Sequence, residues 1–312
     1  MCLKYEPKRG SHHFPEYLDY EYCKDSNFAT IRWCEKATES YKNNLRMLDC
    51  WGLAYIEFLK SHQDNLNPRG LRIEIKNKGN INTFTLEMLR RRVSFLNFND
   101  NLINVELIIE NKEDKLYSKD NLYNRPENEI IHQDIPDRSF DDKPGRLEKD
   151  LQAFISRVKD NRRLAYFGSD FYKMKKKYGL IREFATGVFT GQVKESTRIL
   201  PTNFVDFVSF NKYRKLSIIE LKINDSKLEA ISQLLDYAIY FAAYRSQLNS
   251  LIIKKIGKEN CPSSFIDHPI VGYLVNNYFH PKFGSIKKYY KTDPKKDEFS
   301  LRQVTLGRIS LI

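Results

Sequence analysis

Two carboxylates and one amine stand close together in residues 204–222. The stretch reads Phe-Val-Asp-Phe-Val-Ser-Phe, then five turn-type residues, then Leu-Ser-Ile-Ile-Glu-Leu-Lys, so Asp206, Glu220 and Lys222 interrupt otherwise apolar runs. Two short apolar runs joined by a polar loop predict a β-hairpin with residues 211–215 as its connection. The hairpin would then carry three charged groups on a largely apolar surface.

The register of this hairpin decides whether the charged groups meet. If Phe210 pairs with Leu216, Asp206 lies opposite Glu220, where like charges about 4.5–5.5 Å apart at Cβ are destabilising. Side chains alternate between the two faces of a strand, so Lys222 shares a face with Glu220. A bound divalent cation would account for this arrangement, because Mg²⁺ takes carboxylate oxygens as ligands and a nearby lysine can orient or activate a water molecule.

The elements around the hairpin must position these groups. Apolar residues at helical spacing predict a helix from Leu147 to Val158. Ser226 and Glu229 form a capping box, which predicts a helix that continues to about Tyr244. The other expected elements are strands at 250–256 and 270–276, a short helix at 282–290 and one or two strands at 300–311. Strands that alternate with helices predict a mixed α/β layer fold.

The two predicted helices offer further candidate residues. Glu148 lies in the first turn of its helix at the edge of the apolar stripe, where it could be a third carboxylate or simply a residue favoured by the helix dipole. Gln233 and Tyr237 are one turn apart on the capped helix and share a face. An amide and a hydroxyl so placed can contact a phosphate or a nucleobase, or hydrogen-bond the lysine. Each is also compatible with an ordinary helical position.

Charge is distributed unevenly along the chain. The net charge is +12, with 22 Lys and Arg against 24 Asp and Glu in residues 1–145, and 30 against 16 in residues 146–312. A charge of +14 confined to the second half favours a polyanionic partner, most simply nucleic acid. A basic tract in this half is the best candidate for contacts to a phosphate backbone. It could also be simply a solvated surface. It comprises Lys173, Lys175, Lys176 and Lys177.

A polar stretch with three prolines, residues 126–145, has neither helical nor strand periodicity and predicts a linker. It separates an α+β domain at 1–125, with a recognition or regulatory role, from a domain at 146–312. Within the first domain we expect an irregular start at 1–30, a helix in 31–62, strands at 71–76 and 102–110, and a helix at 86–96. A second Glu-x-Lys, Glu74-Ile-Lys76, has no hairpin aspartate before it and is interpreted as a charge pair on an edge strand.

The composition limits the class of protein. With 312 residues, 41% of them hydrophobic, the chain can bury a substantial core, while no apolar run approaches the ~20 residues of a membrane span. The N-terminus lacks an apolar signal core, so we expect a soluble cytoplasmic protein without a membrane partner. Five cysteines without a Cys-x-x-Cys pair predict buried or idle thiols rather than a disulfide framework or a zinc site. No phosphate-binding loop is present, so an ATPase is expected only as a separate partner.

Taken in chain order, the candidate residues resemble the PD-(D/E)XK nuclease superfamily. The matching positions are Glu148, Asp206, Glu220-Leu-Lys222 and Gln233-Leu-Leu-Asp-Tyr237. They correspond to a helix glutamate, a hairpin aspartate, the E-x-K strand and the Q-x-x-x-Y helix of the RecB-like branch, and the local pattern is similar to NucS endonucleases. The resemblance covers roughly residues 146–256, and the proline that precedes the family's aspartate is Val205 here. It implies a restriction-endonuclease-like mixed β-sheet core flanked by helices.

The resemblance also implies an activity, which is Mg²⁺- or Mn²⁺-dependent hydrolysis of phosphodiester bonds, most simply by endonucleolytic cleavage of DNA in defence, restriction or repair. The metal ligands that it implies are Asp206, Glu220, the backbone carbonyl of Leu221 and Glu148, the last directly or through water. Lys222 would position the attacking water or stabilise the developing charge. Gln233 and Tyr237 would shape the substrate side of the site.

Other interpretations stay open. Glu220 and Lys222 could be a solvated ion pair of little energetic value, and the domain could be a non-catalytic nucleic-acid-binding or regulatory module on a nuclease-like scaffold. An RNA nuclease or a nucleotide hydrolase would use similar residues. Cutting both strands of a duplex requires two sites, so a homodimer or higher oligomer is compatible with the first interpretation, as is a separate partner protein. His280 is interpreted as a turn residue rather than a second base.

Overall fold

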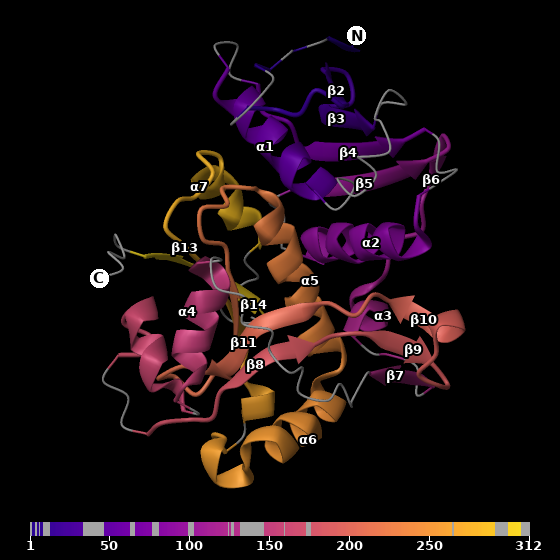
Figure 1. Ribbon diagram of the computed structural model, residues 1–312. Helices are drawn as coiled ribbons and strands as arrows, with labels where there is room; N and C mark the ends of the chain where they lie inside the picture. Colours follow the sequence, from indigo (N-terminus) through magenta and orange to yellow (C-terminus); the bar gives the residue numbers. More distant parts are fainter. Residues whose placement is uncertain are drawn as a thin grey trace. The chain divides into compact units, whose positions relative to one another are not determined.

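The computed structural model shows a mixed α/β protein (Figure 1). It describes residues 2–3, 5, 7–8, 13–33, 47–62, 66–76, 81–98, 103–123, 125, 128–131, 147–158, 160–172, 176–263, 265–290 and 299–306. The chain forms two compact units. Unit 1 comprises Met1–Leu122, Lys227–Asp236 and His280–Asp293, and unit 2 comprises Tyr123–Ser226, Tyr237–Phe279 and Pro294–Ile312. Two segments from the second half of the chain therefore belong with the N-terminal residues, which differs from the single domain expected after residue 145.

Unit 1 is built on a six-stranded sheet in the order β1-β2-β3-β4-β5-β6. Its strands are β1 (Cys2–Leu3), β2 (Leu18–Cys23), β3 (Phe28–Trp33), β4 (Gly70–Ile75), β5 (Asn104–Ile109) and β6 (Lys112–Glu113). Its helices are α1 (Leu48–Lys60), α2 (Thr83–Phe98), α3 (Lys119–Tyr123, which ends in unit 2), α7 (Phe283–Ile286) and the 3-10 helix η6 (Lys287–Tyr290). Strands β3, β4 and β5 are parallel. Because α1 and α2 provide the crossovers between these parallel strands, the core of this unit is α/β rather than the expected α+β.

Several expectations for this unit need correction. The segment expected to be irregular, 1–30, contains β1, β2 and the start of β3, and Trp33 lies in β3 rather than in a helix. Residues 34–46 of the predicted helix lie outside the described residues. Strand β4 lies between β3 and β5, so Glu74 is not on an edge strand, and it pairs with Arg32 at 2.6 Å. Cys23 is disulfide-bonded, which corrects its expected role as an idle thiol.

Unit 2 contains the predicted hairpin in the middle of a five-stranded sheet, in the order β14-β13-β12-β11-β8. The strands are β8 (Ile181–Ala185), β11 (Phe204–Phe210), β12 (Leu216–Leu221), β13 (Ile270–Asn276) and β14 (Phe299–Thr305). Strand β11 pairs antiparallel with both β8 and β12. Strand β13 pairs parallel with both β12 and β14. Phe210 pairs with Leu216, which confirms the predicted register.

Helices and a small sheet complete unit 2. They are α4 (Leu147–Ser156), η2 (Asn161–Phe167), η3 (Glu195–Thr197), α5 (Glu229–Ala243, whose first turns belong to unit 1), α6 (Arg245–Ile256), η4 (Lys258–Asn260) and η5 (Phe265–Asp267). The small sheet has the order β10-β9-β7, with β10 (Arg198–Leu200), β9 (Val188–Thr190) and β7 (Glu129–Ile131). Part of the predicted linker is thus a strand, and residues 132–146 lie outside the described residues. The prediction of a strand at 250–256 is wrong, because these residues form the second half of α6.

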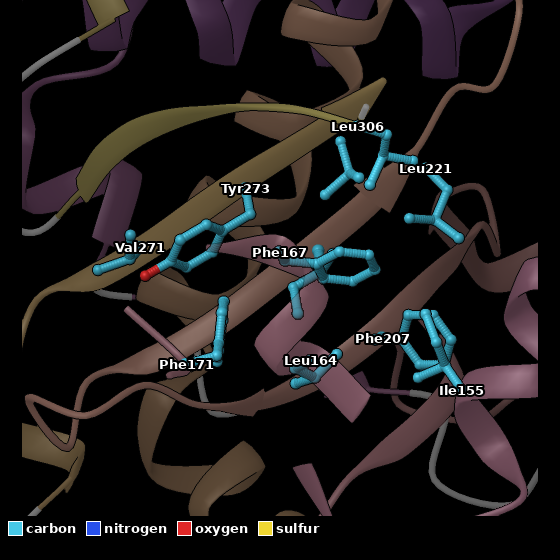
Figure 2. Packing of buried hydrophobic residues seen from close by; sticks show 11 residues of the cluster. Ile155, Leu164, Phe167, Phe171, Phe207, Leu221, Val271, Tyr273 and Leu306 are labelled. Atoms are coloured by element: carbon cyan, nitrogen blue, oxygen red, sulfur yellow. The ribbon is translucent and has the colours of Figure 1, made fainter. Parts of the chain in front are cut away.

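One face of the five-stranded sheet carries the core that holds the hairpin in place. Figure 2 shows the side chains of this core gathered around the strands. They come from α4, η2, the residues after η2, and the strands β11 to β13: Ile155, Leu164, Phe167, Phe171, Phe207, Ile219, Leu221, Val271, Tyr273 and Val275, with Leu306. Phe207, Ile219 and Leu221 alternate with Asp206 and Glu220 along the hairpin, as a period of two requires. In the part of the chain that is described, no helix has both the length and the apolar character needed to cross a bilayer.

Candidate active site

The loop of the hairpin sets the register that brings the charged residues together. Asn211 caps the loop, because its Oδ1 accepts hydrogen bonds from the backbone N–H groups of Tyr213 (3.0 Å) and Lys215 (3.2 Å). Its Nδ2 donates to the Tyr273 hydroxyl at 3.0 Å on the neighbouring strand β13. Arg214 adopts a left-handed backbone with φ of 63°. This local network, rather than the charged residues, closes the loop and fixes which residues oppose one another.

Asp206 is held from two sides. Because Phe207 pairs with Ile219, the register of the hairpin places Asp206 opposite Glu220. Its Oδ2 accepts a hydrogen bond from the Leu221 backbone N–H at 2.6 Å, and its Oδ1 accepts one from the Gln152 side-chain amide of α4. Both oxygens of a buried carboxylate therefore have N–H donors, which fixes the orientation of the group.

Lys222 pairs with the second carboxylate. Its Nζ lies 2.6 Å from Glu220 Oε1, and the side chains are 18% and 2% exposed respectively. This is a buried ion pair rather than the solvated pair that the sequence left open, because water can reach little of either group. Such a pair is costly to desolvate, so its presence at the end of β12, a strand in the middle of the sheet, favours a functional reason.

Burial and mutual repulsion shift the acidity of these groups. Burial, followed by the charge of Glu220, raises the pKa of Asp206 well above its ordinary value, although Lys222 and the Leu221 N–H oppose the change. Burial also raises the pKa of Glu220, with the charge of Glu148 adding to the effect. The pKa of Lys222 is raised despite burial, because Glu220, Asp206 and Glu148 favour its charged form. Lys222 therefore holds its proton and is suited to stabilise negative charge rather than to act as a base.

Two buried oxygen atoms of the site have no hydrogen-bond partner among the described residues. These are Glu220 Oε2 and Gln152 Oε1. Both are acceptors, and oxygen atoms of this kind are the ligands that hard divalent cations prefer. The described residues contain no group of three or more His, Cys, Asp or Glu placed to hold a metal ion. The set that fits a cation is therefore two carboxylates with neutral oxygens and water, as Mg²⁺ sites commonly have.

Helix α4 contributes a residue that the sequence analysis missed. Glu148 is half-buried and close enough for its charge to affect the pKa values of Asp206, Glu220 and Lys222. Gln152, one turn later on the same face, makes the direct contact with Asp206 and is 4% exposed. Gln152 follows Glu148 by four residues, so the sequence already indicates that the two share a helical face. The search for a third carboxylate favoured Glu148 and passed over the neutral amide.

The structure gives the two α5 candidates different settings. Tyr237 is buried, and its hydroxyl donates to the backbone carbonyl of Phe204 at 2.9 Å, at the start of the strand that carries Asp206. Tyr237 thus supports the hairpin from within unit 2. Gln233 lies one turn earlier, is half-buried, and belongs to the part of α5 that is grouped with unit 1.

The remaining candidates are more peripheral. Lys176 and Lys177 are exposed, as phosphate contacts require, whereas Lys173 and Lys175 lie outside the described residues. His280 is buried, and its Nδ1 accepts the backbone N–H of Lys282 at 3.1 Å, which agrees with its interpretation as a turn residue.

No family model and no curated protein matches the chain.

Strand β8 adds an irregularity beside Asp206. In its pairing with β11, Val205 lies opposite Phe184 and Phe207 lies opposite Arg182. Asp206 and Glu183 stand between these two pairs, but they do not pair regularly. Glu183 has φ of 48°, a left-handed conformation that is uncommon for a residue within a strand. Strained backbone conformations cluster at functional sites. Glu183, which the sequence did not single out, has such a conformation on the strand next to Asp206.

Proposed function

We propose that unit 2 is a divalent-cation-dependent nuclease of the PD-(D/E)XK type that hydrolyses phosphodiester bonds, most simply in DNA. The observation that carries this proposal is the buried pair of carboxylates, Asp206 and Glu220, with Lys222 bonded to one of them and an unpartnered oxygen on the same glutamate. Hydrolases that use a cation need this combination of oxygen ligands and positive charge at one place.

The surrounding elements support the proposal. The order of helix glutamate, hairpin aspartate, E-x-K strand and following helix is present as α4, β11, β12 and α5, on a mixed sheet with flanking helices. The charge of +14 on residues 146–312 suits a polyanionic substrate. Within the described residues, the exposed Lys176 and Lys177 offer contacts to a phosphate backbone.

The chain's own residues suggest a division of roles. Asp206 and Glu220 would hold the cation, which when bound polarises the scissile phosphate and lowers the pKa of a bound water molecule. The Leu221 N–H and Gln152 keep Asp206 in one orientation. Lys222 keeps its proton and would stabilise the negative charge that develops on the phosphate oxygens. The Leu221 carbonyl is a further oxygen ligand of this proposal, and Glu148 would act on the cation through a water molecule.

Cleavage assays test the proposal directly. Wild type, Glu220→Gln and Lys222→Ala would be incubated with linear duplex, supercoiled plasmid, single-stranded DNA and RNA in Mg²⁺, Mn²⁺ or EDTA. We expect metal-dependent cleavage that both substitutions reduce by at least about 100-fold, as for loss of a group that stabilises charge in the transition state.

The second Glu-x-Lys of the chain supplies matched controls. Glu74→Gln on β4 and Lys76→Ala, just after the end of β4, make comparable chemical changes in unit 1, and they should leave cleavage unchanged. Cleavage that survives Glu220→Gln would overturn the proposed site. Binding of DNA with no metal dependence and no cleavage would favour the non-catalytic module instead.

A further inference from the structure

Gln152 of α4 makes a direct hydrogen bond to a carboxylate of the site. Its Nε2 donates to Asp206 Oδ1, while its Oε1 is buried and has no hydrogen-bond partner among the described residues. The side chain is 4% exposed, and Ile155, three residues later on the same helix, belongs to the core. A buried amide with one half bonded and the other half unpartnered carries an energetic cost unless another ligand completes it.

The unpartnered half lies beside the candidate ligands. Oε1 and Nε2 share one carbon atom, so Oε1 is within a few ångströms of Asp206 Oδ1, to which Nε2 is bonded. Glu220, opposite Asp206, has an unpartnered buried oxygen of its own. Two buried acceptor oxygens that have no donor among the described residues, on the two side chains next to Asp206, are ligands of the kind that a hydrated cation requires.

We propose that Gln152 is a positioning residue for the cation: its N–H₂ group orients Asp206, and its side-chain oxygen receives the cation or one of the cation's water molecules. The inference rests on the proposed function and extends it, since the carboxylate of Glu148 then acts one turn away through charge rather than through direct contact. A neutral amide in this place adds an oxygen ligand without a third negative charge beside Asp206 and Glu220.

Direct measurement of Mn²⁺ binding tests the proposal without reference to cleavage. Isothermal titration calorimetry of the full chain at pH 8 would compare wild type, Gln152→Met and Gln152→Glu. Methionine keeps the side-chain volume in the core but removes both polar atoms. We expect it to weaken Mn²⁺ binding by about 10- to 100-fold, as for other residues that orient metal ligands. Glutamate restores oxygen ligands and should bind Mn²⁺ at least about tenfold more tightly than the methionine variant.

Asp150→Asn is the matched control on the same helix, because Asp150 is exposed and has no place in the site; its Mn²⁺ affinity should equal that of wild type. Circular dichroism in EDTA verifies that each variant is folded. Wild-type affinity in Gln152→Met would overturn this inference alone. Absence of Mn²⁺ binding in the wild type would overturn the proposed function together with it, so the two failures are distinguishable.

Discussion

Lys222 makes a buried pair of carboxylates tolerable. Its Nζ is 2.6 Å from Glu220 Oε1, and Glu220 is 2% exposed. Lys222→Met removes the ammonium group and keeps the aliphatic stem, so Glu220 is left as an uncompensated buried charge. Breaking such a pair lowers the free energy of unfolding by about 3–5 kcal/mol. Urea unfolding in EDTA should show this loss, and Lys76→Met, at an exposed lysine, should change the unfolding free energy by less than about 0.5 kcal/mol. A loss below about 1 kcal/mol at Lys222 would contradict the buried pair.

The raised pKa of Asp206 gives stability a characteristic pH dependence. Because burial and Glu220 raise the pKa above the ordinary value of 3.8, this carboxyl binds more protons in the folded state than in the unfolded state between that value and its folded pKa. This carboxyl therefore destabilises the metal-free protein progressively as pH rises from about 4 through its folded pKa. Asp206→Asn should gain stability relative to wild type over the same interval. Urea unfolding in EDTA at pH 4, 6 and 8 measures the difference, and a gap that narrows as pH rises would contradict the shift.

Tyr237 can be assigned to structure or to chemistry by removing one atom. Its buried hydroxyl donates to the Phe204 carbonyl at 2.9 Å. Tyr237→Phe should cost about 0.5–1.5 kcal/mol of unfolding free energy, the ordinary value of a buried hydrogen bond. If the hydroxyl only supports β11, cleavage under saturating conditions stays within about threefold of wild type. A loss of 100-fold or more with unchanged stability would instead place the hydroxyl on the substrate, as the family resemblance implies.

At the scale of elements, β8 contains a local conflict between residue type and backbone. A left-handed backbone costs an L-residue about 1–2 kcal/mol, and glycine avoids this cost but loses more conformational freedom on folding. Glu183, with φ of 48°, should therefore tolerate Glu183→Gly with stability unchanged or raised by up to about 1 kcal/mol. Glu183→Val should lose more than about 1 kcal/mol, because a β-branched side chain disfavours this conformation. Thermal unfolding of both variants measures the contrast, and equal stability would show that the backbone at 183 is extended in solution.

Elements with clear periodicity and loop chemistry could be predicted from the sequence, and those defined by context could not. The hairpin at 204–221, its register and helix α4 follow from alternation, a polar loop and 3.6-residue spacing. Residues 250–256 were wrongly expected to form a strand because a short apolar run fits a strand or a helix equally well, and the preceding turns of α6 decide the matter. Strand β7 was missed for the opposite reason, since three residues show no period until β9 pairs with them.

At the scale of the molecule, unit 1 depends on residues far along the chain. Arg92 is fully buried and binds Asp49 at 3.1 Å and Asp236 at 2.8 Å. Asp49 also accepts hydrogen bonds from Ser232 and Tyr290. Asp236, Ser232 and Tyr290 come from the two segments that join unit 1 from the second half of the chain.

A fragment of residues 1–125 tests this dependence. It matches the domain predicted from the sequence, but it lacks three partners of the buried Arg92–Asp49 pair and also α7, which packs against α1, so we expect it not to fold. Proton NMR dispersion and circular dichroism would show an unfolded or aggregated fragment, with the full chain as the control. In the full chain, Arg92→Met should cost about 3–5 kcal/mol. A cooperatively folded fragment would show that the two later segments are dispensable.

The sequence by itself determined which reactive groups are brought together. The hairpin register places Asp206 opposite Glu220, Lys222 follows two residues later, and the second half of the chain is basic. These follow from local rules, namely strand alternation, loop length and helical spacing. Only the tertiary structure decided what surrounds them. Burial turned Glu220 and Lys222 into a desolvated pair, and packing of α4 brought Gln152 rather than Glu148 onto Asp206. Desolvation and contacts between distant segments depend on how elements pack, and no spacing along the chain encodes them.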